Sequence, residues 1–225
     1  MLNQKNSHYM SNIAVFGSTG LIGSNLLKYL EHDTYFSKVN VITRKPIHFK
    51  NSKFKNIVID FSDINSIQNS LKNSQIVFVS IGTTQSKVNW DLKKYKKIDY
   101  EIPINIAKAA KKLNIKKYLI VSSAGADINA KGFYLSLKGQ IESDIIKIGI
   151  KNTYIFRPSL LLGARKENRV GEKIAQVIMP LFSFLLPKKY RPINSEYVAK
   201  SMINLSKTNI NSVKIYHYED IILSN

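Results

Sequence analysis

The chain has 225 residues, of which 44% are apolar, enough for one domain that buries a substantial core. Its formal net charge of +19 would attract phosphates, nucleic acid or an anionic membrane surface, but the lysines are dispersed, which is more typical of solvated faces than of a polyanion site. It contains no cysteine, which excludes disulfides and thiolate chemistry, and its first residues, MLNQKNSHYMSN, lack the apolar stretch of a secretory signal, so we expect a soluble protein in the cytoplasm.

Short runs rich in β-branched residues alternate with helical patterns along the chain. The runs predict strands at residues 12–17, 39–44, 56–61, 76–82, 117–123, 152–158 and 213–218. Helical patterns occupy residues 21–31, 64–72, 100–114 and 134–149. Near-continuous apolar runs are typical of strands buried on both faces of a parallel sheet. The sequence therefore predicts an α/β fold, a Rossmann-type doubly wound parallel sheet that binds its ligand at the carboxyl ends of the strands.

No repeat or linker divides the chain, so we expect a single domain over residues 1–225. Within it, residues 12–158 form the predicted dinucleotide-binding Rossmann core. The alternation loosens after residue 158, and residues 159–225 are expected to form a small C-terminal cap on the substrate side together with the last strand. This last part is too short to bury a core of its own.

The strongest local signal is AVFGSTGLIGSNLL, with glycines at 17, 20 and 23 between the first strand and the first helix. Gly17 would allow a sharp turn, Gly20 would let backbone amides approach a pyrophosphate at the positive end of the helix, and Gly23 would let helix and strand pack closely. The spacing is G-x-x-G-x-x-G, whereas the usual dinucleotide fingerprint is G-x-G-x-x-G, and a flexible turn is the alternative. The expected cofactor-binding residues here are Gly17, Ser18, Thr19, Gly20, Leu21, Ile22 and Gly23.

The second strand ends in ITRKP, about 20 residues past the turn, where folds that bind NAD(H) carry an acidic residue for the ribose 2′-hydroxyl. Arg44 instead offers a guanidinium, with Lys45 and Thr43 beside it, and this suits a 2′-phosphate. The sequence therefore predicts NADP(H) as the cofactor in preference to NAD(H). An ordinary exposed loop arginine is the alternative.

Two further strand ends lie on the expected path of the cofactor. Asp60 is placed to accept from the adenine amino group, with Phe61 as an apolar wall, although an Asp or Ser of DFSDIN could equally be the N-cap of the next helix. Ile81, Gly82 and Thr83 end the fourth strand in SIGTTQ. They are expected to contact the pyrophosphate and nicotinamide half, with a plain turn as the alternative.

The stretch GFYLSLKGQ places Tyr134 four residues before Lys138, so a helix would put both side chains on one face. About two such pairs are expected by chance in a chain with 12 tyrosines and 34 lysines and arginines, so the count alone is uninformative. The context adds weight, because the pair begins the helix after the fifth strand, downstream of two serines. A neighbouring ammonium makes a phenol a better acid–base group at neutral pH.

Together these motifs resemble the short-chain dehydrogenase/reductases, and within them the atypical Tat-interacting-protein-like oxidoreductases. The resemblance rests on GSTGLIG, VITR, IVIDF, SIGTT, YLIVSSAGAD, FYLSLKGQIES, YIFRPSLLLGARKENRVGE and INSEYVAKSM, in that order, and covers roughly residues 12–205. SIGTT and FRPSLLLGxR are the specific motifs, since the glycine motif is shared much more widely.

This resemblance implies a Ser–Tyr–Lys site. In such enzymes the tyrosine gives or takes the proton at the substrate oxygen, the lysine favours the ionised tyrosine and binds the nicotinamide ribose, and the serine orients the substrate oxygen. Carried over by motif, Tyr134 and Lys138 take the first two roles. Ser122 or Ser123 takes the third, because neighbouring strand residues point in opposite directions, and we favour Ser122.

Two features follow the sixth strand. Arg157 and Pro158 resemble the family's segment beside the nicotinamide, with a simple strand stop as the alternative. The apolar stretch VIMPLFSFLLP, at 177–187, is well short of the roughly 20 residues that cross a bilayer. We expect a substrate-pocket wall or core, with a dimer contact or a membrane-surface contact assisted by Lys188 and Lys189 as alternatives.

The sequence thus predicts an NADP(H)-dependent oxidoreductase that passes hydride between nicotinamide and a small carbonyl or alcohol substrate while Tyr134 moves the proton. The alternative is a regulator that senses NADPH and acts through a protein partner without turnover. Binding of nucleic acid or a membrane surface through the basic charge is a third, less favoured interpretation. No metal site is expected, because the four histidines stand far apart, at His8, His32, His48 and His217.

Overall fold

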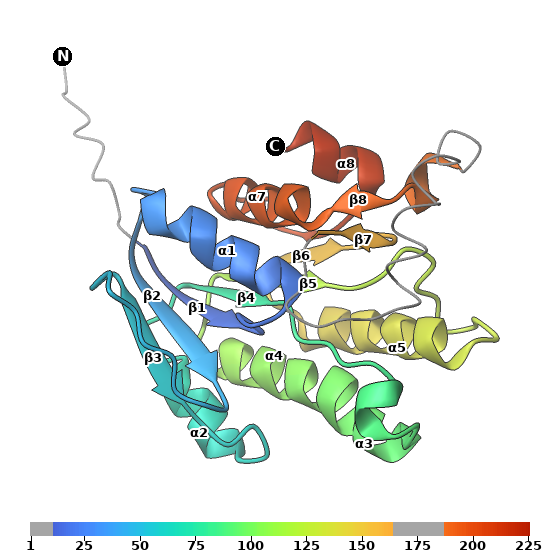
Figure 1. The fold of residues 1–225 in the computed structure, drawn as a ribbon, viewed down its shortest axis with the longest axis horizontal. Helices are drawn as coiled ribbons and strands as arrows, with labels where there is room; N and C mark the ends of the chain where they lie inside the picture. The colour runs from blue at the N-terminus through green and yellow to red at the C-terminus, as the bar shows by residue number, and fades with distance from the viewer. Residues whose placement is uncertain (1–10, 164–186) are drawn as a thin grey trace.

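A seven-stranded parallel sheet organises the computed structural model, which describes residues 11–163 and 187–225 (Figure 1). The strand order is β3-β2-β1-β4-β5-β6-β9, and every neighbouring pair is parallel. This is the predicted Rossmann order with β9 added beside β6, so the α/β prediction is confirmed. The strands are β1 (Ser11–Phe16), β2 (Phe36–Thr43), β3 (Phe54–Val58), β4 (Ile76–Val79), β5 (Lys117–Val121), β6 (Asn152–Phe156) and β9 (Val213–Tyr216).

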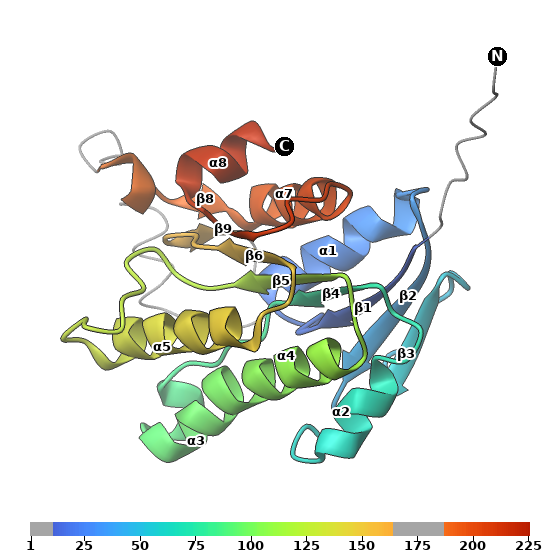
Figure 2. The same ribbon diagram turned by 180° about the vertical axis from the view of Figure 1, so that it is seen from behind.

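Helices cover both faces of this sheet (Figures 1 and 2). One face carries α1 (Leu21–His32) and α7 (Ser195–Ser206), with α8 (Tyr218–Leu223) beside α7. The other face carries α2 (Ile64–Ser70), α4 (Ile102–Lys112) and α5 (Phe133–Ile148), while the short α3 (Leu92–Lys96) lies at a corner below α5 in both views.

The alternation of side chains along β1 explains the two layers. Ile13 and Val15 point into the cluster formed with α1 and α7, whereas Ala14 and Phe16 point into the cluster formed with α2, α4 and α5. All four are fully buried. A strand that is apolar at every position buries all its side chains only when helices cover both faces of the sheet. This is why the continuous apolar runs indicated a doubly wound sheet.

Each predicted strand runs past the observed carboxyl end. The first residues beyond those ends still donate to a neighbouring strand, as the Ser80 amide does to the Phe16 carbonyl at 3.0 Å. The residues farther on leave the sheet, yet some still pack on the core, as Phe61 and Ile81 do. Apolar character therefore continues where the ladder has stopped. The sequence also did not indicate α3, the π-helical turn Lys97–Glu101, α8, or the two-stranded sheet of β7 (Leu161–Leu162) and β8 (Ile193–Asn194).

The region after residue 158 is described in part. Helix α7 precedes the last strand, β9, and the short α8 follows it. The apolar stretch at 177–187 lies, up to residue 186, outside the described residues, and the cap over the substrate side stays a prediction. Within residues 11–163 and 187–225, none of the helices has the length and apolar character needed to cross a membrane.

Three tyrosines are locked into the core with their hydroxyls satisfied by the protein or shielded by neighbours. Tyr118 donates to the Pro103 carbonyl at 2.8 Å, and Tyr154 donates to the Thr208 carbonyl at 2.6 Å. The rings of Tyr154 and Tyr216 stack with centroids 6.1 Å apart. Burial raises the pKa of all three phenols from the ordinary 10.0, and raises the pKa of Tyr216 to about 12.

We therefore expect the protein to lose stability at alkaline pH because these three buried phenols must ionise when it unfolds. The unfolded chain ionises them near pH 10 while the folded chain holds their protons, so the free energy of unfolding falls as pH rises above about 10, by up to about 1.4 kcal/mol per pH unit for each tyrosine. Tyrosinate absorbance and circular dichroism, followed together against pH, check this. Replacing Tyr118 by Phe should remove one late-titrating group, and a single step near pH 10 for all 12 tyrosines with retained structure would contradict the expectation.

Candidate functional site

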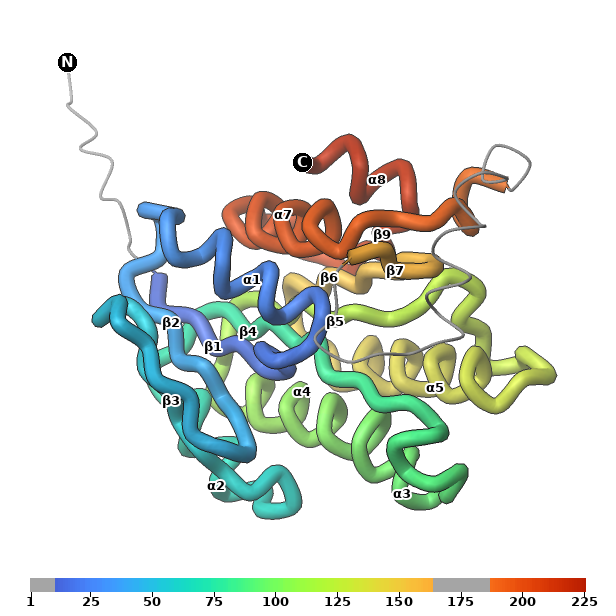
Figure 3. The backbone as a smooth tube through the Cα atoms, in the orientation of Figure 1, coloured from blue at the N-terminus to red at the C-terminus, as the bar shows by residue number. Residues whose placement is uncertain are grey.

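The chain turns sharply from β1 into α1 at the switch point of the sheet, beside the end of β4 (Figure 3). Gly17 has a φ of +82°, and a Cβ there would lie 2.6 Å from the Ser80 carbonyl carbon. A Cβ on Gly23 would lie 2.1 Å from the Gly17 carbonyl oxygen. Both positions therefore require glycine, so the turn expected at Gly17 and the close packing expected at Gly23 are confirmed.

The start of α1 fits the pyrophosphate of a dinucleotide. Gly20 is the N-cap, no side chain caps it, and the first turn carries no acidic residue. The Ser18 side chain is buried, and its Oγ has no hydrogen-bond partner among the described residues. A buried hydroxyl is almost always paired, so this orphaned group at the positive end of a helix that no side chain caps suits an anionic ligand. Thr19 and Gly20 are exposed there, whereas Ile22 and Gly23 are buried.

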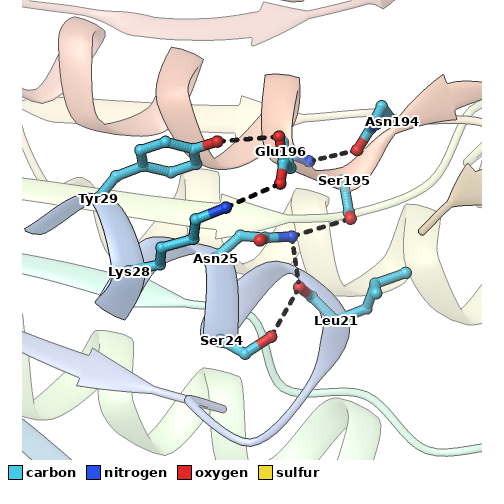
Figure 4. A network of polar contacts seen from close by, with 8 residues as sticks. All are labelled: Leu21, Ser24, Asn25, Lys28, Tyr29, Asn194, Ser195 and Glu196. Carbon is cyan, nitrogen blue, oxygen red and sulfur yellow. Dashed lines mark hydrogen bonds and ion pairs between the residues drawn. The ribbon is translucent and has the colours of Figure 1, made fainter. Parts of the chain in front are cut away.

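A polar network joins α1 to the start of α7 (Figure 4). Asn25 donates to the Leu21 carbonyl at 3.1 Å and to Ser195 Oγ at 3.0 Å. Glu196 accepts from the Tyr29 hydroxyl at 2.9 Å and pairs with Lys28 at 3.2 Å. The C-terminal segment therefore sets the orientation of the helix whose first turn faces the candidate cofactor site.

Arg44 lies exposed directly after β2, in a turn that is built by its neighbours. Thr43 donates from Oγ1 to the Lys45 carbonyl at 2.7 Å, and Asn56 donates to Thr43 Oγ1 at 2.8 Å. Asn56 Oδ1 also accepts the Ile47 amide at 2.9 Å. The turn thus presents the guanidinium at the carboxyl edge of the sheet, where the sequence placed it.

After β3, the structure shows which acidic residue caps the next helix, a point that the sequence left open. Asp63, and not Asp60, is the N-cap of α2, since its carboxylate accepts the Asn65 and Ser66 amides. Asp60 is exposed, and the Ser62 amide, which it accepts at 2.8 Å, lowers the pKa of its carboxyl. Phe61 is half-buried with its ring edge-on to Phe16, 6.1 Å between centroids. An adenine contact by Asp60 and Phe61 stays a prediction.

The segment after β4 is tied to a buried carboxylate that the sequence analysis missed. Asp99 is 1% exposed and lies in the π-helical turn Lys97–Glu101. Its Oδ2 accepts the Thr83 amide at 2.7 Å, and Gly82 lies beside Oδ1. Burial raises the pKa of Asp99, although the Lys138 ammonium and the Thr83 amide oppose this. Thr83 is therefore held in one conformation next to Ile81 and Gly82.

Lys138 of α5 forms an ion pair with the Asp99 carboxylate. Its Nζ lies 3.2 Å from Asp99 Oδ1, and both side chains are buried. The same Nζ lies 5.8 Å from the centroid of the Tyr134 ring. Tyr134 is 41% exposed in the first turn of α5. The structure thus brings the predicted pair together, as a buried ammonium beneath a phenol that solvent can reach.

The two serines after β5 differ in their surroundings. The buried Ser122 hydroxyl donates to Glu142 Oε1, and Glu142 in turn pairs with the Arg157 guanidinium, 2.5 Å from Nη2 to Oε2. Ser123 is only half-buried. The Ser122 hydroxyl is therefore engaged in a buried Ser–Glu–Arg network, and its role as the substrate-orienting serine stays a prediction.

Arg157 and Pro158 are positioned by contacts on several sides. The Arg157 amide donates to the Tyr216 carbonyl at 2.9 Å, and its guanidinium makes the Glu142 pair. Pro158 is buried, and its carbonyl accepts the Ala124 amide at 2.8 Å. These contacts tie the segment after β6 to the segment after β5, on the side of the sheet where α5 lies.

The chain is similar in sequence to a family of NAD(P)H-binding proteins. A family model described as NAD(P)H-binding matches residues 17–173. The protein named FMP52, mitochondrial, from Candida albicans is 35% identical over 203 residues, which are 88% of this chain and 88% of that protein. Protein HTATIP2 from Rattus norvegicus is 30% identical over 181 residues, 78% of this chain and 74% of that protein. These names state no activity.

Solved structures share the fold at low sequence identity. A UDP-N-acetylglucosamine 4-epimerase from Methanobrevibacter ruminantium has a TM-score of 0.70 at 18% identity, covering 92% of this chain and 76% of that chain. MoeE5, in complex with UDP-glucuronic acid and NAD, has a TM-score of 0.70 at 14% identity, covering 91% of this chain and 75% of that chain. Similarity at this identity shows the fold alone.

The prediction of a cytoplasmic location is wrong on this comparison. Several relatives that this chain matches over most of its length, including those from Candida albicans and Debaryomyces hansenii, are named mitochondrial proteins. The signals behind the prediction were the lack of cysteine and of a secretory sequence. Both argue only against an oxidising secretory compartment, and neither separates the cytoplasm from other reducing compartments.

Replacing Asp99 by Ala should destabilise the fold strongly, because it leaves the buried Lys138 ammonium without its counter-charge and the Thr83 amide without its acceptor. We expect the free energy of unfolding to fall by about 3 kcal/mol or more. Urea unfolding of the purified protein measures this. Asp91→Ala, which removes an N-cap carboxylate from α3, serves as the control and should cost about 1 kcal/mol. Equal losses in the two variants would contradict the assignment.

Proposed function

The chain belongs to the NAD(P)H-binding family, among the atypical short-chain dehydrogenase/reductases, and from this premise we propose that it is an NADP(H)-dependent oxidoreductase acting on a small carbonyl or alcohol substrate. One observation carries the proposal. The fold keeps a buried ammonium, Lys138, paired with Asp99 at the carboxyl edge of the sheet and 5.8 Å from the ring of the half-exposed Tyr134. A buried charge is costly, so its position beside an accessible phenol suits acid–base chemistry.

Each residue of the site has a proposed part in the reaction. NADPH supplies the hydride when bound, and the amides after Gly20 with Ser18 hold its pyrophosphate. Tyr134 gives its phenolic proton to the substrate oxygen as the carbonyl carbon is reduced, and takes the proton back in the reverse direction. Lys138 stabilises the phenolate left behind. Ser122 or Ser123 orients the substrate oxygen.

Arg44 is the proposed reason for a preference for NADP(H). It is exposed at the end of β2, in the turn that Thr43 and Asn56 hold in place. A guanidinium at this point can make charge-assisted hydrogen bonds with a 2′-phosphate, whereas a carboxylate would repel it.

A sensor of NADPH without turnover is the second candidate. The observation that favours it is the hydroxyl of Ser122, which donates to Glu142 in the buried network instead of standing open toward a substrate. In that case the cofactor would bind as proposed but no carbonyl would be reduced. Turnover separates the two candidates, since both require cofactor binding.

A mitochondrial location is also proposed for this chain. It rests on the names of the FMP52 relatives from several fungi, which this chain matches at 32–37% identity. Fluorescence microscopy of the full chain with a fluorescent protein at its C-terminus tests it.

Replacing Tyr134 by Phe should slow turnover strongly and leave cofactor binding in place. Removing one hydroxyl leaves the ring and its contact with Lys138, so NADPH affinity should change less than about threefold, while reduction of the best substrate from an aldehyde and ketone panel should slow by about 100-fold or more. NADPH absorbance measures turnover, and NADPH-dependent thermal shift measures binding.

The matched control is Tyr197→Phe, an exposed tyrosine on α7, which should leave both readouts unchanged. Unchanged turnover in Tyr134→Phe would refute the role of Tyr134. Cofactor binding without turnover of any carbonyl in the panel would favour the sensor.

Arg44→Gln should weaken NADPH binding by about tenfold and leave NADH binding unaltered, since only NADPH carries the 2′-phosphate. Fluorescence titration of each reduced cofactor gives the two dissociation constants. Lys50→Gln, an exposed lysine in the same loop, is the control of equal charge change. If both cofactors weaken equally in Arg44→Gln, this residue does not select between them.

A further inference from the structure

The segment between β4 and α4 exposes an apolar tip surrounded by basic side chains. Trp90 is 70% exposed and Leu92 is 46% exposed. Lys93, Lys94, Lys96 and Lys97 follow directly, and all are exposed. We call these six residues the Trp90 surface. The enclosed Tyr95 packs inward, edge-on to Phe133 of α5 at 5.6 Å, so α3 is anchored on one side and leaves the rest outside.

The tip is an ordered turn. Trp90 has a φ of +61° and follows Asn89 at +52°, and this left-handed conformation is unfavourable for a bulky side chain. It is held by the Trp90 amide, which donates to the Gln85 carbonyl at 2.8 Å, and by the Asp91 amide, which donates to the Val88 carbonyl at 3.0 Å. Val88 is buried beneath. The fold therefore fixes a large apolar ring in solvent, and backbone strain of this kind suggests a function.

The charge around the tip is one-sided. Residues 86–97 contain five lysines and one aspartate, a net charge of +4. The aspartate, Asp91, caps α3 and lies 3.8 Å from Lys94. On the helix, Leu92 and Lys96 are four residues apart and share a face, as do Lys93 and Lys97. Lysine stems can lie along an apolar surface while their ammonium groups stay in water.

We infer that the Trp90 surface docks on an anionic bilayer surface. Tryptophan favours the interface between acyl chains and headgroups, and basic residues beside it are attracted to anionic lipids. Peripheral binding usually needs two such signals, and this surface supplies both within eight residues, 90–97. A phosphate polymer would use the lysines but has no place for Leu92, so nucleic acid fits the surface less well.

Trp90 is the single tryptophan of the chain, so tryptophan fluorescence reports on this surface alone. We expect vesicles of equal parts phosphatidylcholine and phosphatidylserine to shift its emission to shorter wavelength, and brominated acyl chains to quench it. Vesicles of phosphatidylcholine alone should have little effect. Added salt should reverse the shift, because the attraction to lipid is screened.

Sedimentation with the same vesicles tests the residues. Lys93→Gln/Lys97→Gln should lower the partition coefficient by about thirtyfold, since each basic residue near the surface contributes roughly a five- to sixfold change. Lys112→Gln/Lys116→Gln, an equal change of charge at the end of α4, should lower it much less. Trp90→Ala should lower it by about tenfold, and Tyr197→Ala, an exposed aromatic on α7, should not.

Three results would overturn the inference: no sedimentation with anionic vesicles, sedimentation with unchanged tryptophan emission, or equal losses in the two lysine pairs. An emission shift with duplex DNA but none with vesicles would also overturn it, in favour of nucleic acid. NADPH-dependent thermal shift of the same variants should be retained. The docking inference and the proposed oxidoreductase activity can therefore fail separately.

Discussion

The ion pair between Asp99 and Lys138 is the interaction on which the candidate site depends. Both side chains are buried, and a buried charge without a partner costs several kcal/mol, so neither group can leave the other cheaply. Asp99 also accepts the Thr83 amide that follows β4, while Lys138 comes from α5, which follows β5. One carboxylate thus joins two strand ends and fixes the ammonium beside the Tyr134 ring.

Along one face of α5, side chains become more buried from the first turn onward. Tyr134, Lys138 and Glu142 are spaced by four residues, and only Tyr134 is exposed, whereas Lys138 and Glu142 are buried. Lys138 is neutralised by Asp99, and Glu142 by Arg157 with the Ser122 hydroxyl. Two compensated charges therefore lie behind one accessible phenol. Of the three groups, the phenol is the one that a substrate can reach without breaking an ion pair.

The sequence predicted the parts of the fold and site whose cause is local. Gly23 is required by its contact with the Gly17 carbonyl six residues earlier, and Gly17 by the positive φ of the turn itself, so their spacing alone indicated the turn. Asp99 is different, because its partner Lys138 is 39 residues away and Asp99 itself lies in a π-helical turn that the sequence did not indicate. Glu142 and Ser122 are likewise 20 residues apart. No spacing rule connects such residues, although an acid within the lysine-rich stretch KKYKKIDYE was a signal that could have been followed.

The net charge of +19 does not by itself indicate a binding site, because the effect of each lysine depends on its surroundings in the fold. Most lysines are solvated and separate, and some are used internally, as Lys117 is when it donates to the Ser206 carbonyl at 2.6 Å. Around Trp90 the same residue type adjoins exposed apolar side chains on a fixed turn. The segment from Thr83 to Glu101 therefore has two sides with different chemistry. Its buried side holds Asp99 against Lys138, and its exposed side joins apolar and positive groups, so the same short stretch both shapes the candidate site and forms the surface next to it.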